Sequence, residues 1–435
     1  MRRKICFVVL VAAMVLSMLT GCGSDGENTV NNSAESEEEK VTLSFYVWNS
    51  EEAYIQKVID EYEKTHENVE VELTVVSGEN TDYEEKLQML FAAKDDSVDL
   101  VDLRGTAQLS ELANGGALQD ITDMLSNNSL DVSSYGPMWD SSAVGGNFYA
   151  LPTRTTCWVL YYNKDLLDKA GIEYPSKQLT WKEYADLCDV IYQTCKEKGI
   201  TAADGSEVKG GMLVNWVMDY YSIQKGVYLN SDDTDSIKEG LEMSKDIYSR
   251  ESCYSYTQIN ATDFDYLADF ENGKAALMPN GEWMVNMFLE DVAAGKADVN
   301  WGVTYMPIPE GAEDYTTFGD FQYVGISAYS KHKEESFDFL TYLAGESGAE
   351  SYSKDGIIHA YSSADVIAAY KEATDNDTVS VFFESKKIQE QPVDEGYGEI
   401  KQAYVENADL YLLNETSLEE CMEKFINQRN SILNK

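Results

Sequence analysis

The stretch VTLSFYVWNSEEAYIQKVIDEYEKTHENVEVELTVV, residues 41–76, decides the fold. Apolar side chains alternate over residues 41–47 and again over 69–75, which predicts two strands with one buried face each. Between the two strands, apolar residues recur at the spacing of one helix face, at Tyr54, Ile55, Val58, Ile59 and Tyr62. A strand, a helix and a second strand in this order predict a parallel sheet with helices on its faces.

The same alternation continues toward the C-terminus. Thr81 and Glu84 form a capping-box pattern that predicts the start of a second helix, and residues 98–103 are expected to form a third strand. Ligands of such sheets bind beyond the carboxyl ends of the strands. Trp48 and Asn49 after the first strand, and Arg104 after the third, are therefore candidates to face a ligand.

A second set of elements begins after residue 152. Residues 158–162 predict an apolar strand, and Thr180 with Glu183 predicts the capped start of a long helix that Gly199 ends. Further elements are expected as strands at 275–278, 301–306 and 323–328, and as helices from about residue 282 and over 336–343. Residues 41–435 are more than a single core usually supports, which predicts two lobes.

The N-terminus has the layout of a lipoprotein leader. Three basic residues precede an apolar run over residues 5–19, which ends in Leu19-Thr20-Gly21-Cys22. We expect residues 1–21 to be a lipoprotein signal peptide, with Cys22 as the lipidated residue that anchors the protein to the membrane. An ordinary cleaved signal is the alternative. Residues 22–40 are rich in Gly, Ser, Asn and Glu and are expected to form a disordered acidic tether.

The formal net charge of −44 excludes nucleic acid as a partner and disfavours an anionic ligand. Cysteine usage does not fit a disulfide framework, because five cysteines without tight spacing follow Cys22. Cys188 and Cys195 share the apolar stripe of one predicted helix, so we expect both to be buried thiols. The three histidines show no zinc spacing and no nucleophile motif accompanies them, so no metal site, cofactor or catalytic residue is predicted.

Four segments together resemble the family of extracellular solute-binding proteins that includes the maltose-binding protein. They are GNFYALP (146–152), LYYNKDL (160–166), FENGKAA (270–276) running on to NGEW (280–283), and VGIS (324–327) followed by FDFL (337–340). The resemblance implies an α/β fold of two lobes, the type II periplasmic-binding-protein fold, in which each lobe is a mainly parallel sheet flanked by helices.

The resemblance also implies domain boundaries and a function. Lobe 1 would contain residues 41–155 and 306–330, and lobe 2 residues 156–305 and 331–435, with crossings near 155–158, 303–309 and 327–331. A mono- or oligosaccharide would be held between the lobes and delivered to the permease subunits of an ABC importer. The protein would be a monomer, anchored by its lipid to the extracellular face of the cell membrane.

A sugar presents apolar C–H faces and a rim of hydroxyls, so its site needs flat aromatic rings and planar polar side chains. Trp283 matches a family tryptophan that stacks on a pyranose; Trp48, Trp216 and Tyr220 are further aromatic candidates, with core packing as their alternative. The remaining candidates are polar or come late in the chain: Asn49, Asp102, Arg104, Arg154, Thr155, Glu282, Asp320, Gln322 and Tyr397. Thr155 stands where some relatives place a carboxylate, which speaks against simple transfer of maltose specificity.

Two other function classes stay open on the sequence. The Tyr220-Tyr221 pair and the acidic composition favour a polyamine or a ferric ion as the solute. A secreted glycoside hydrolase that uses two carboxylates is the second, since spacing in sequence does not fix the separation of acidic residues in space.

Overall fold

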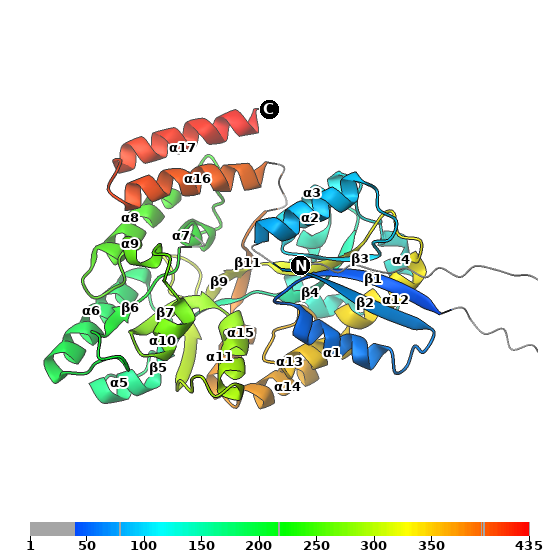
Figure 1. The fold of residues 1–435 in the computed structure, drawn as a ribbon. Coiled ribbons are helices and arrows are strands. Elements are labelled where there is room, and N and C mark those ends of the chain that lie inside the picture. Colours follow the sequence, from blue (N-terminus) through cyan, green and yellow to red (C-terminus); the bar gives the residue numbers. More distant parts are fainter. Residues whose placement is uncertain (1–39, 78–79, 216–217, 393, 395, 435) are drawn as a thin grey trace, which may run out of the picture. The chain divides into compact units, whose positions relative to one another are not determined.

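The computed structural model describes residues 40–77, 80–215, 218–392, 394 and 396–434. The predicted signal peptide, the lipidation site Cys22 and the tether up to residue 39 lie outside the described residues, as does Trp216. Residues 40–435 form one compact unit with two main sheets (Figure 1). We use lobe 1 for the first sheet with the helices packed on it, and lobe 2 for the second.

The sheet of lobe 1 has the strand order β2-β1-β3-β10-β4. The stretch that decides the fold forms strand, helix and strand as predicted, and β1 pairs in parallel with both β2 and β3. β10 runs antiparallel to β3 and β4. The bounds are β1 (Val41–Trp48), β2 (Val69–Val76), β3 (Leu100–Leu103), β4 (Ala150–Thr155) and β10 (Phe321–Ile326).

Helices cover both faces of this sheet. One face, with Leu43, Phe45 and Val47, packs against α1 (Glu52–Tyr62), α12 (Lys333–Ala344) and α13 (Glu346–Ser353). The other face lies under α2 (Asn80–Ala92) and α3 (Thr106–Asn114). Tyr83 holds α2 over the sheet, because its hydroxyl is 3.0 Å from the Tyr46 carbonyl oxygen and 2.8 Å from that of Asp102. The side chain of Thr81, and with it the predicted capping box, lies outside the described residues. Lobe 1 also contains α4 (Thr122–Ser126) and the 3-10 helix η1 (Val132–Ser142).

The sheet of lobe 2 has the order β6-β7-β5-β8 and is mixed rather than mainly parallel. β5 lies between β7 and β8 and is antiparallel to both. The chain enters lobe 1 along β10 and lobe 2 along β5. Each of these two strands runs antiparallel to both of its neighbours because the chain arrives from the other lobe. The bounds are β5 (Trp158–Asn163), β6 (Lys209–Gly211), β7 (Ala275–Gly281) and β8 (Trp301–Tyr305).

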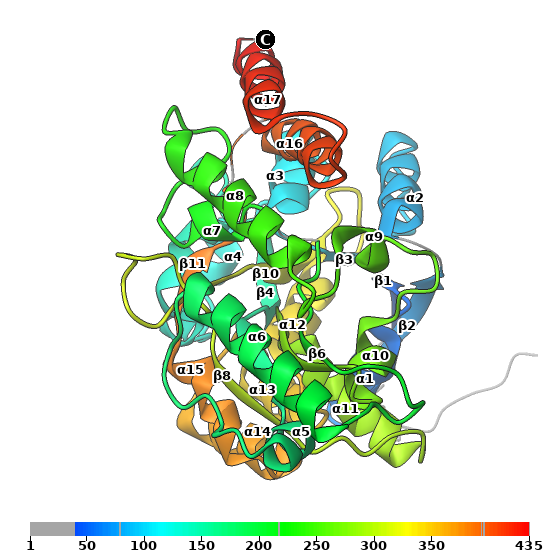
Figure 2. The same ribbon diagram turned by 90° about the vertical axis from the view of Figure 1, so that its left-hand side faces the viewer.

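Helices enclose this second sheet, and α16 and α17 pack beside α8 (Figures 1 and 2). The predicted capping box at Thr180 and Glu183 is present, and Gly199 ends the helix with φ of 65°. The helices are α5 (Lys164–Ala170), α6 (Trp181–Lys198), α7 (Tyr220–Ile223), α8 (Asp235–Ser249), α9 (Tyr256–Ile259), α10 (Tyr266–Glu271), α11 (Trp283–Ala293), α15 (Val381–Glu384), α16 (Tyr397–Leu412) and α17 (Leu418–Leu433).

The first crossing lies where the sequence predicts it, at Thr156 and Cys157 between β4 and β5. The predicted crossing at 303–309 is wrong, because Ile308 stays in lobe 2, where its amide donates to the Leu179 carbonyl. The chain instead crosses after β9 (Thr316–Gly319), which pairs with β11 (Lys386–Gln389) and leads directly into β10.

The predicted crossing at 327–331 is also wrong. Ser327 and Ser330 both bond to Asp99 of lobe 1, and α12 packs against β1, β4 and β10. Residues 306–319 therefore belong with lobe 2 and residues 331–353 with lobe 1, the reverse of the expected boundaries. The chain returns along α14 (Ala364–Thr374), where Val366 lies in the core of lobe 1 and Tyr370 in that of lobe 2, and continues into the 3-10 helix η2 (Asp377–Ser380).

The five cysteines that the structure describes are free and buried, which confirms the expectation for Cys188 and Cys195. Within the described ranges, none of the helices combines the length and the apolar character needed to cross a bilayer.

Removing the cap of α6 tests the local basis of this helix. Thr180→Ala should lower the free energy of unfolding by about 1 kcal/mol, because the amide of Glu183 loses its acceptor. Denaturant unfolding measures the change, with Gln193→Ala on the exposed face of the same helix as the control. The control should change stability by less than about 0.5 kcal/mol; equal effects would contradict the role of the cap.

Candidate functional site

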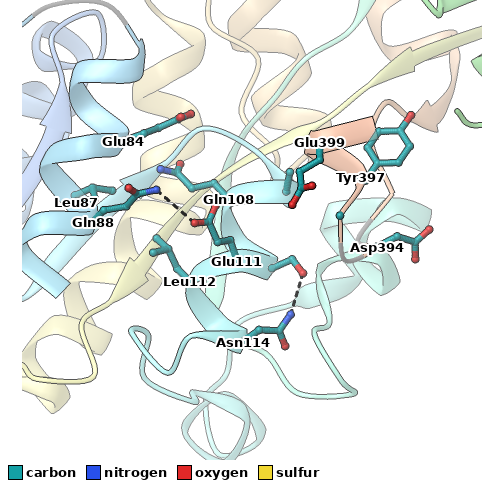
Figure 3. Close-up of a pocket in the computed structure, with 14 residues that line it drawn as sticks. Glu84, Leu87, Gln88, Gln108, Glu111, Leu112, Asn114, Asp394, Tyr397 and Glu399 are labelled. Carbon is teal, nitrogen blue, oxygen red and sulfur yellow. Dashed lines mark hydrogen bonds between the residues drawn. The ribbon is translucent and has the colours of Figure 1, made fainter. Parts of the chain in front are cut away.

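A pocket of about 840 Å³ lies between α2 and α3 on one side and the start of α16 on the other (Figure 3). Four carboxylates, three amide side chains and one phenol contribute to its wall: Glu84, Glu111, Asp394, Glu399, Gln88, Gln108, Asn114 and Tyr397. Its described lining contains no lysine, arginine or histidine. Such a wall offers many acceptors and a few donors to a hydroxylated solute.

Glu84 and Glu111 set the electrostatics of this pocket. Burial raises the pKa of Glu84, the neighbouring charge of Glu111 raises it further, and Arg104 acts in the opposite direction. The side chains of Gln88 and Glu111 are joined by a hydrogen bond of 3.4 Å, visible in Figure 3. The pocket therefore disfavours an anionic solute and suits a neutral or a cationic one.

Arg104 and Trp48 form a stacked pair beside the pocket. The guanidinium carbon of Arg104 lies 4.1 Å from the centroid of the Trp48 ring. The Arg104 amide donates to Oε1 of Gln108, a residue that lines the pocket, at 2.7 Å. The carboxyl ends of β1 and β3 thus bring these two predicted site residues together, as expected for a parallel pair of strands.

A chain of five charges, three buried carboxylates and two part-buried arginines, runs from β3 to the start of α11. Glu51 lies at its centre, with Oε1 2.5 Å from Nη1 of Arg104 and 3.6 Å from Nη1 of Arg154. Asp102 flanks Arg104 at 3.8 Å, and Nη2 of Arg154 donates to Oε1 of Glu282 at 3.1 Å. Because Glu282 belongs to lobe 2 and the other four residues to lobe 1, this charge chain joins the lobes.

Burial shifts the pKa of the carboxyl group at each end of this chain. It raises the pKa of Asp102 to about 7, with Glu51 adding to the shift and the two arginines opposing it. Burial also raises the pKa of Glu282, although Arg154 and the Cys157 amide stabilise its charged form. One oxygen of Asp102 and the Nε atoms of Arg104 and Arg154 are buried without a hydrogen-bond partner among the described residues.

A second polar cluster surrounds Asp320, where the chain crosses into β10. Its carboxylate accepts hydrogen bonds of 2.5 Å from Thr106 Oγ1 and from Gln389 Nε2. Burial raises the pKa of Asp320 to about 6, while these hydrogen bonds oppose the shift. Gln389 is the last residue of β11, which pairs with β9, so the cluster connects α3, the crossing and β11.

Lys401 lies among three carboxylates next to this cluster. Burial lowers the pKa of Lys401, but Asp219, Glu390 and Asp320 outweigh it and raise the pKa. Burial raises the pKa of Glu390 to about 7, with Lys401 opposing. Tyr397, which lines the pocket, places its hydroxyl 3.5 Å from an oxygen of Asp219.

Trp283 is the first residue of α11 and is half-buried. Its ring stands edge-on to Trp158, with centroids 5.3 Å apart and planes at 90°. A Cβ added to Gly281 would lie 1.9 Å from the Trp283 ring, so the ring lies directly on the backbone at the end of β7. Glycine is required there because any side chain would displace the ring.

The other predicted site residues lie apart from these groups. Asn49 is exposed in the turn after β1, and Gln322 lies on β10 opposite Arg154. Thr155 is buried at the end of β4 and lines a different pocket. Tyr220 is in the core of lobe 2, where its hydroxyl is 3.0 Å from Ser244 Oγ and its ring packs on Trp181.

Sequence reasoning missed Glu51, Gln389, Glu390 and Lys401. Glu51 could have been found, because it follows Asn49 and Ser50 at the same strand end that made Trp48 a candidate. The other three come from β11 and α16, which are distant in sequence from the predicted sheet edges and carry no motif. Across the described stretches, no group of three or more His, Cys, Asp or Glu side chains is placed to hold a metal ion.

Residues 48–350 match the family model described as bacterial extracellular solute-binding protein. This chain belongs to that family. Among its relatives, a galactooligosaccharide-binding protein of Bacillus subtilis is 24% identical over 370 residues, covering 80% of this chain and 78% of the relative. A maltooligosaccharide ABC transporter solute-binding lipoprotein of Streptococcus pneumoniae is 25% identical over 414 residues, covering 88% of this chain and 86% of the relative.

Solved structures confirm the two-lobed fold of this solute-binding protein. A sugar transporter from Rhizobium etli in an open conformation matches with a TM-score of 0.78 at 23% identity, covering 90% of this chain and 99% of the other. An ABC substrate-binding protein from Listeria monocytogenes in complex with cycloalternan matches with a TM-score of 0.74 at 20% identity, covering 91% and 98%. The fold is that of the type II periplasmic binding proteins, as predicted.

Substitution of Glu51 tests the charge chain of this solute-binding protein, because this carboxylate pairs with both arginines. Glu51→Gln should lower the free energy of unfolding by about 3–5 kcal/mol, because Arg104 and Arg154 lose the carboxylate between them. Glu52→Gln, one residue further on the exposed side of α1, is the matched control and should stay within about 0.5 kcal/mol. Denaturant unfolding compares the two; similar values would show that the charge chain contributes little.

Proposed function

We propose that this solute-binding protein is the carbohydrate-capturing component of an ABC importer. It binds an oligosaccharide between its lobes, passes it to the permease subunits, and acts as a monomer that has no catalytic activity of its own. A lipid on Cys22 holds it at the extracellular face of the cell membrane.

The observation that carries this proposal is the wall of the pocket between α2, α3 and α16. Carboxylate and amide groups without a cationic side chain suit the hydroxyls of a neutral sugar. The volume of about 840 Å³ falls in the range of about 300–1,000 Å³ typical of small-molecule sites. The relatives named for galactooligosaccharides and maltooligosaccharides support a ligand of this class.

Two aromatic rings that lie outside the described lining of this pocket favour a sugar over another polar solute. Trp48 is held by Arg104, and Trp283 stands on Trp158 at the start of α11. An indole face covers the C–H face of a pyranose, while Asp320 and Tyr397 supply polar atoms from the crossing and from lobe 2. We infer that the sugar contacts these residues together with Asp102, Arg104, Arg154 and Glu282.

A polyamine is the second candidate, and the four pocket carboxylates favour it. A ferric ion has less support, because the hydroxyl of Tyr220 contacts Ser244 in the core instead of pointing to a shared ligand position. A glycoside hydrolase would need one protonated and one ionised carboxyl group across the scissile bond.

A thermal-shift and calorimetric screen of malto-, galacto- and arabinooligosaccharides, with spermidine included, tests the proposal. One oligosaccharide should stabilise the protein, by about 2.7 kcal/mol at a hundred times its Kd. Trp283→Ala should weaken its binding at least tenfold, whereas Trp139→Ala, in lobe 1 against Phe148, should leave the affinity within about twofold.

The outcomes of this screen separate the candidates. Stabilisation by spermidine and by none of the oligosaccharides would show that the solute is a polyamine and not a sugar. Near-normal sugar affinity of Trp283→Ala with a large loss of stability would contradict its stacking role. Release of smaller sugars during long incubation would instead support the glycoside hydrolase.

The lipid anchor has its own test. Cys22→Ala should move the protein from the membrane fraction to the medium, because the leader Leu19-Thr20-Gly21 then has no cysteine to receive the lipid. Cell fractionation and immunoblotting measure this, with Cys188→Ala as the control. Retention of Cys22→Ala at the membrane would rule out this residue as the anchor.

A further inference from the structure

A second pocket, of about 390 Å³, lies at the crossing strands and is called the crossing pocket. It shares no described lining residue with the pocket between α2, α3 and α16, which is called the acidic pocket. Thr155 at the end of β4 and Phe321 at the start of β10 line it, so both crossing segments contribute. η1 and the segment from Ser353 to Val366 line it from lobe 1, and Tyr370 with Phe383 from lobe 2. A ligand there would contact both lobes and the chain between them.

The wall of this crossing pocket is mainly apolar and aromatic. Its large side chains are Tyr135, Met138, Phe321, Ile358, Tyr370 and Phe383. His359 also lines it but adds no charge, because burial lowers its pKa to about 3. Both ring nitrogens of His359 are already used, since Nδ1 accepts from the Tyr361 amide and Nε2 lies 3.1 Å from the Leu343 carbonyl. A mainly apolar wall that also carries polar groups is the usual form of a small-molecule site.

Two hydroxyl groups in this pocket have no hydrogen-bond partner among the described residues. They are Ser353 Oγ and the Tyr370 hydroxyl, on residues that are 1% and 0% exposed. Other hydroxyls of the lining are satisfied, for example Ser385 Oγ, which donates to the Val381 carbonyl at 2.7 Å. A buried hydroxyl without a partner is rare and unfavourable, so an acceptor that reached these two donors would satisfy them.

The charge of the crossing pocket is opposite to that of the acidic pocket. Its described lining contains Lys386 and Lys387 but no aspartate or glutamate, in a chain of net charge −44. Nζ of Lys386 is 2.5 Å from Oε1 of Glu313, with which it forms an ion pair. Lys387, the next residue of β11, forms no ion pair with any residue that the structure describes.

The buried thiol of Cys157 lies near both Lys387 and Tyr370, because the Lys387 charge affects the pKa of the thiol and the thiol affects the pKa of Tyr370. Burial raises the pKa of Cys157 to about 12, and the Lys387 ammonium opposes this shift. Burial, followed by Glu282 and Cys157, raises the pKa of Tyr370. Glu282 is itself paired with Arg154, so its charge is compensated there.

We propose that the crossing pocket is a second ligand site, which binds a small carboxylate with an apolar body. The carboxylate accepts hydrogen bonds from Ser353, Tyr370 and Lys387, and the aromatic wall contacts the apolar part. This site is independent of the sugar site and does not rest on the proposed function. Because both lobes line it, a bound carboxylate stabilises the lobe arrangement in which the pocket exists.

Calorimetric titration of the purified full-length chain with 4-phenylbutyrate tests the site, with 4-phenylbutanol as the uncharged isostere. The acid should bind saturably at one per chain and at least tenfold more tightly than the alcohol. Lys387→Gln should remove this preference. Lys386→Gln is the matched control and should keep it, because the Lys386 charge is already paired.

Tyr370→Phe adds a readout that a purely structural role would not give. It should weaken 4-phenylbutyrate binding severalfold and yet raise the melting temperature of the free protein, because it removes a buried hydroxyl without a partner. Ser353→Ala should act in the same direction, and Trp283→Ala should leave this binding unchanged. The proposal is overturned by absent saturable binding, by equal affinity for acid and alcohol, or by equal effects of Lys386→Gln and Lys387→Gln.

Discussion

The carboxylate of Glu51, buried between the guanidinium groups of Arg104 and Arg154, is the interaction on which the arrangement of the site depends. Glu51 is 2% exposed, so neither its charge nor those of its partners is well hydrated. Burying one charge is costly unless its partners are held close. The ends of β1, β3 and β4 are therefore fixed relative to one another, and through Arg154 they are fixed to Glu282 at the start of α11.

This constraint positions the neighbouring aromatic and polar side chains. The ion pair with Glu51 fixes the position of Arg104. The guanidinium plane of Arg104 stacks on Trp48, and its backbone amide donates to Gln108, which lines the acidic pocket. On the lobe 2 side, Glu282 directly precedes Trp283, whose ring packs on Gly281 and Trp158. Aromatic and polar groups on the two lobes are thus attached to the two ends of one charge chain.

The two pockets of this protein are lined by side chains of opposite charge. Acidic side chains line the cavity at α2, α3 and α16, whereas lysines without acidic neighbours in the described lining face the cavity at the crossing strands. The net charge alone suggested that anions are disfavoured everywhere on this protein. Lys387, beside the apolar wall of the crossing pocket, favours an anion in that one cavity. A nearby unpaired charge interacts with a ligand more strongly than distant charges that are screened by salt.

The sequence by itself determined the elements and the family, because both depend on local patterns. Alternation at 41–47 specified β1 and its buried face, Thr180 and Glu183 specified the start of α6, and the segments from GNFYALP to FDFL specified the fold. The positions of Trp48, Asp102 and Arg104 were predictable because all three lie at or directly after the carboxyl ends of strands that meet at one sheet edge.

Only the tertiary structure decided where the chain crosses and which distant side chains meet. Ser327 and Ser330 turn back onto Asp99, so α12 stays in lobe 1, and no local pattern around residues 327–331 indicates this. Tyr220 has the same residue type as a ligand-contacting aromatic, yet its contact with Ser244 places it in the core. Gln389, Glu390 and Lys401 approach Asp320 only through the pairing of β9 with β11. Such contacts depend on long-range packing of separately formed elements, and residue periodicity carries no information about that packing.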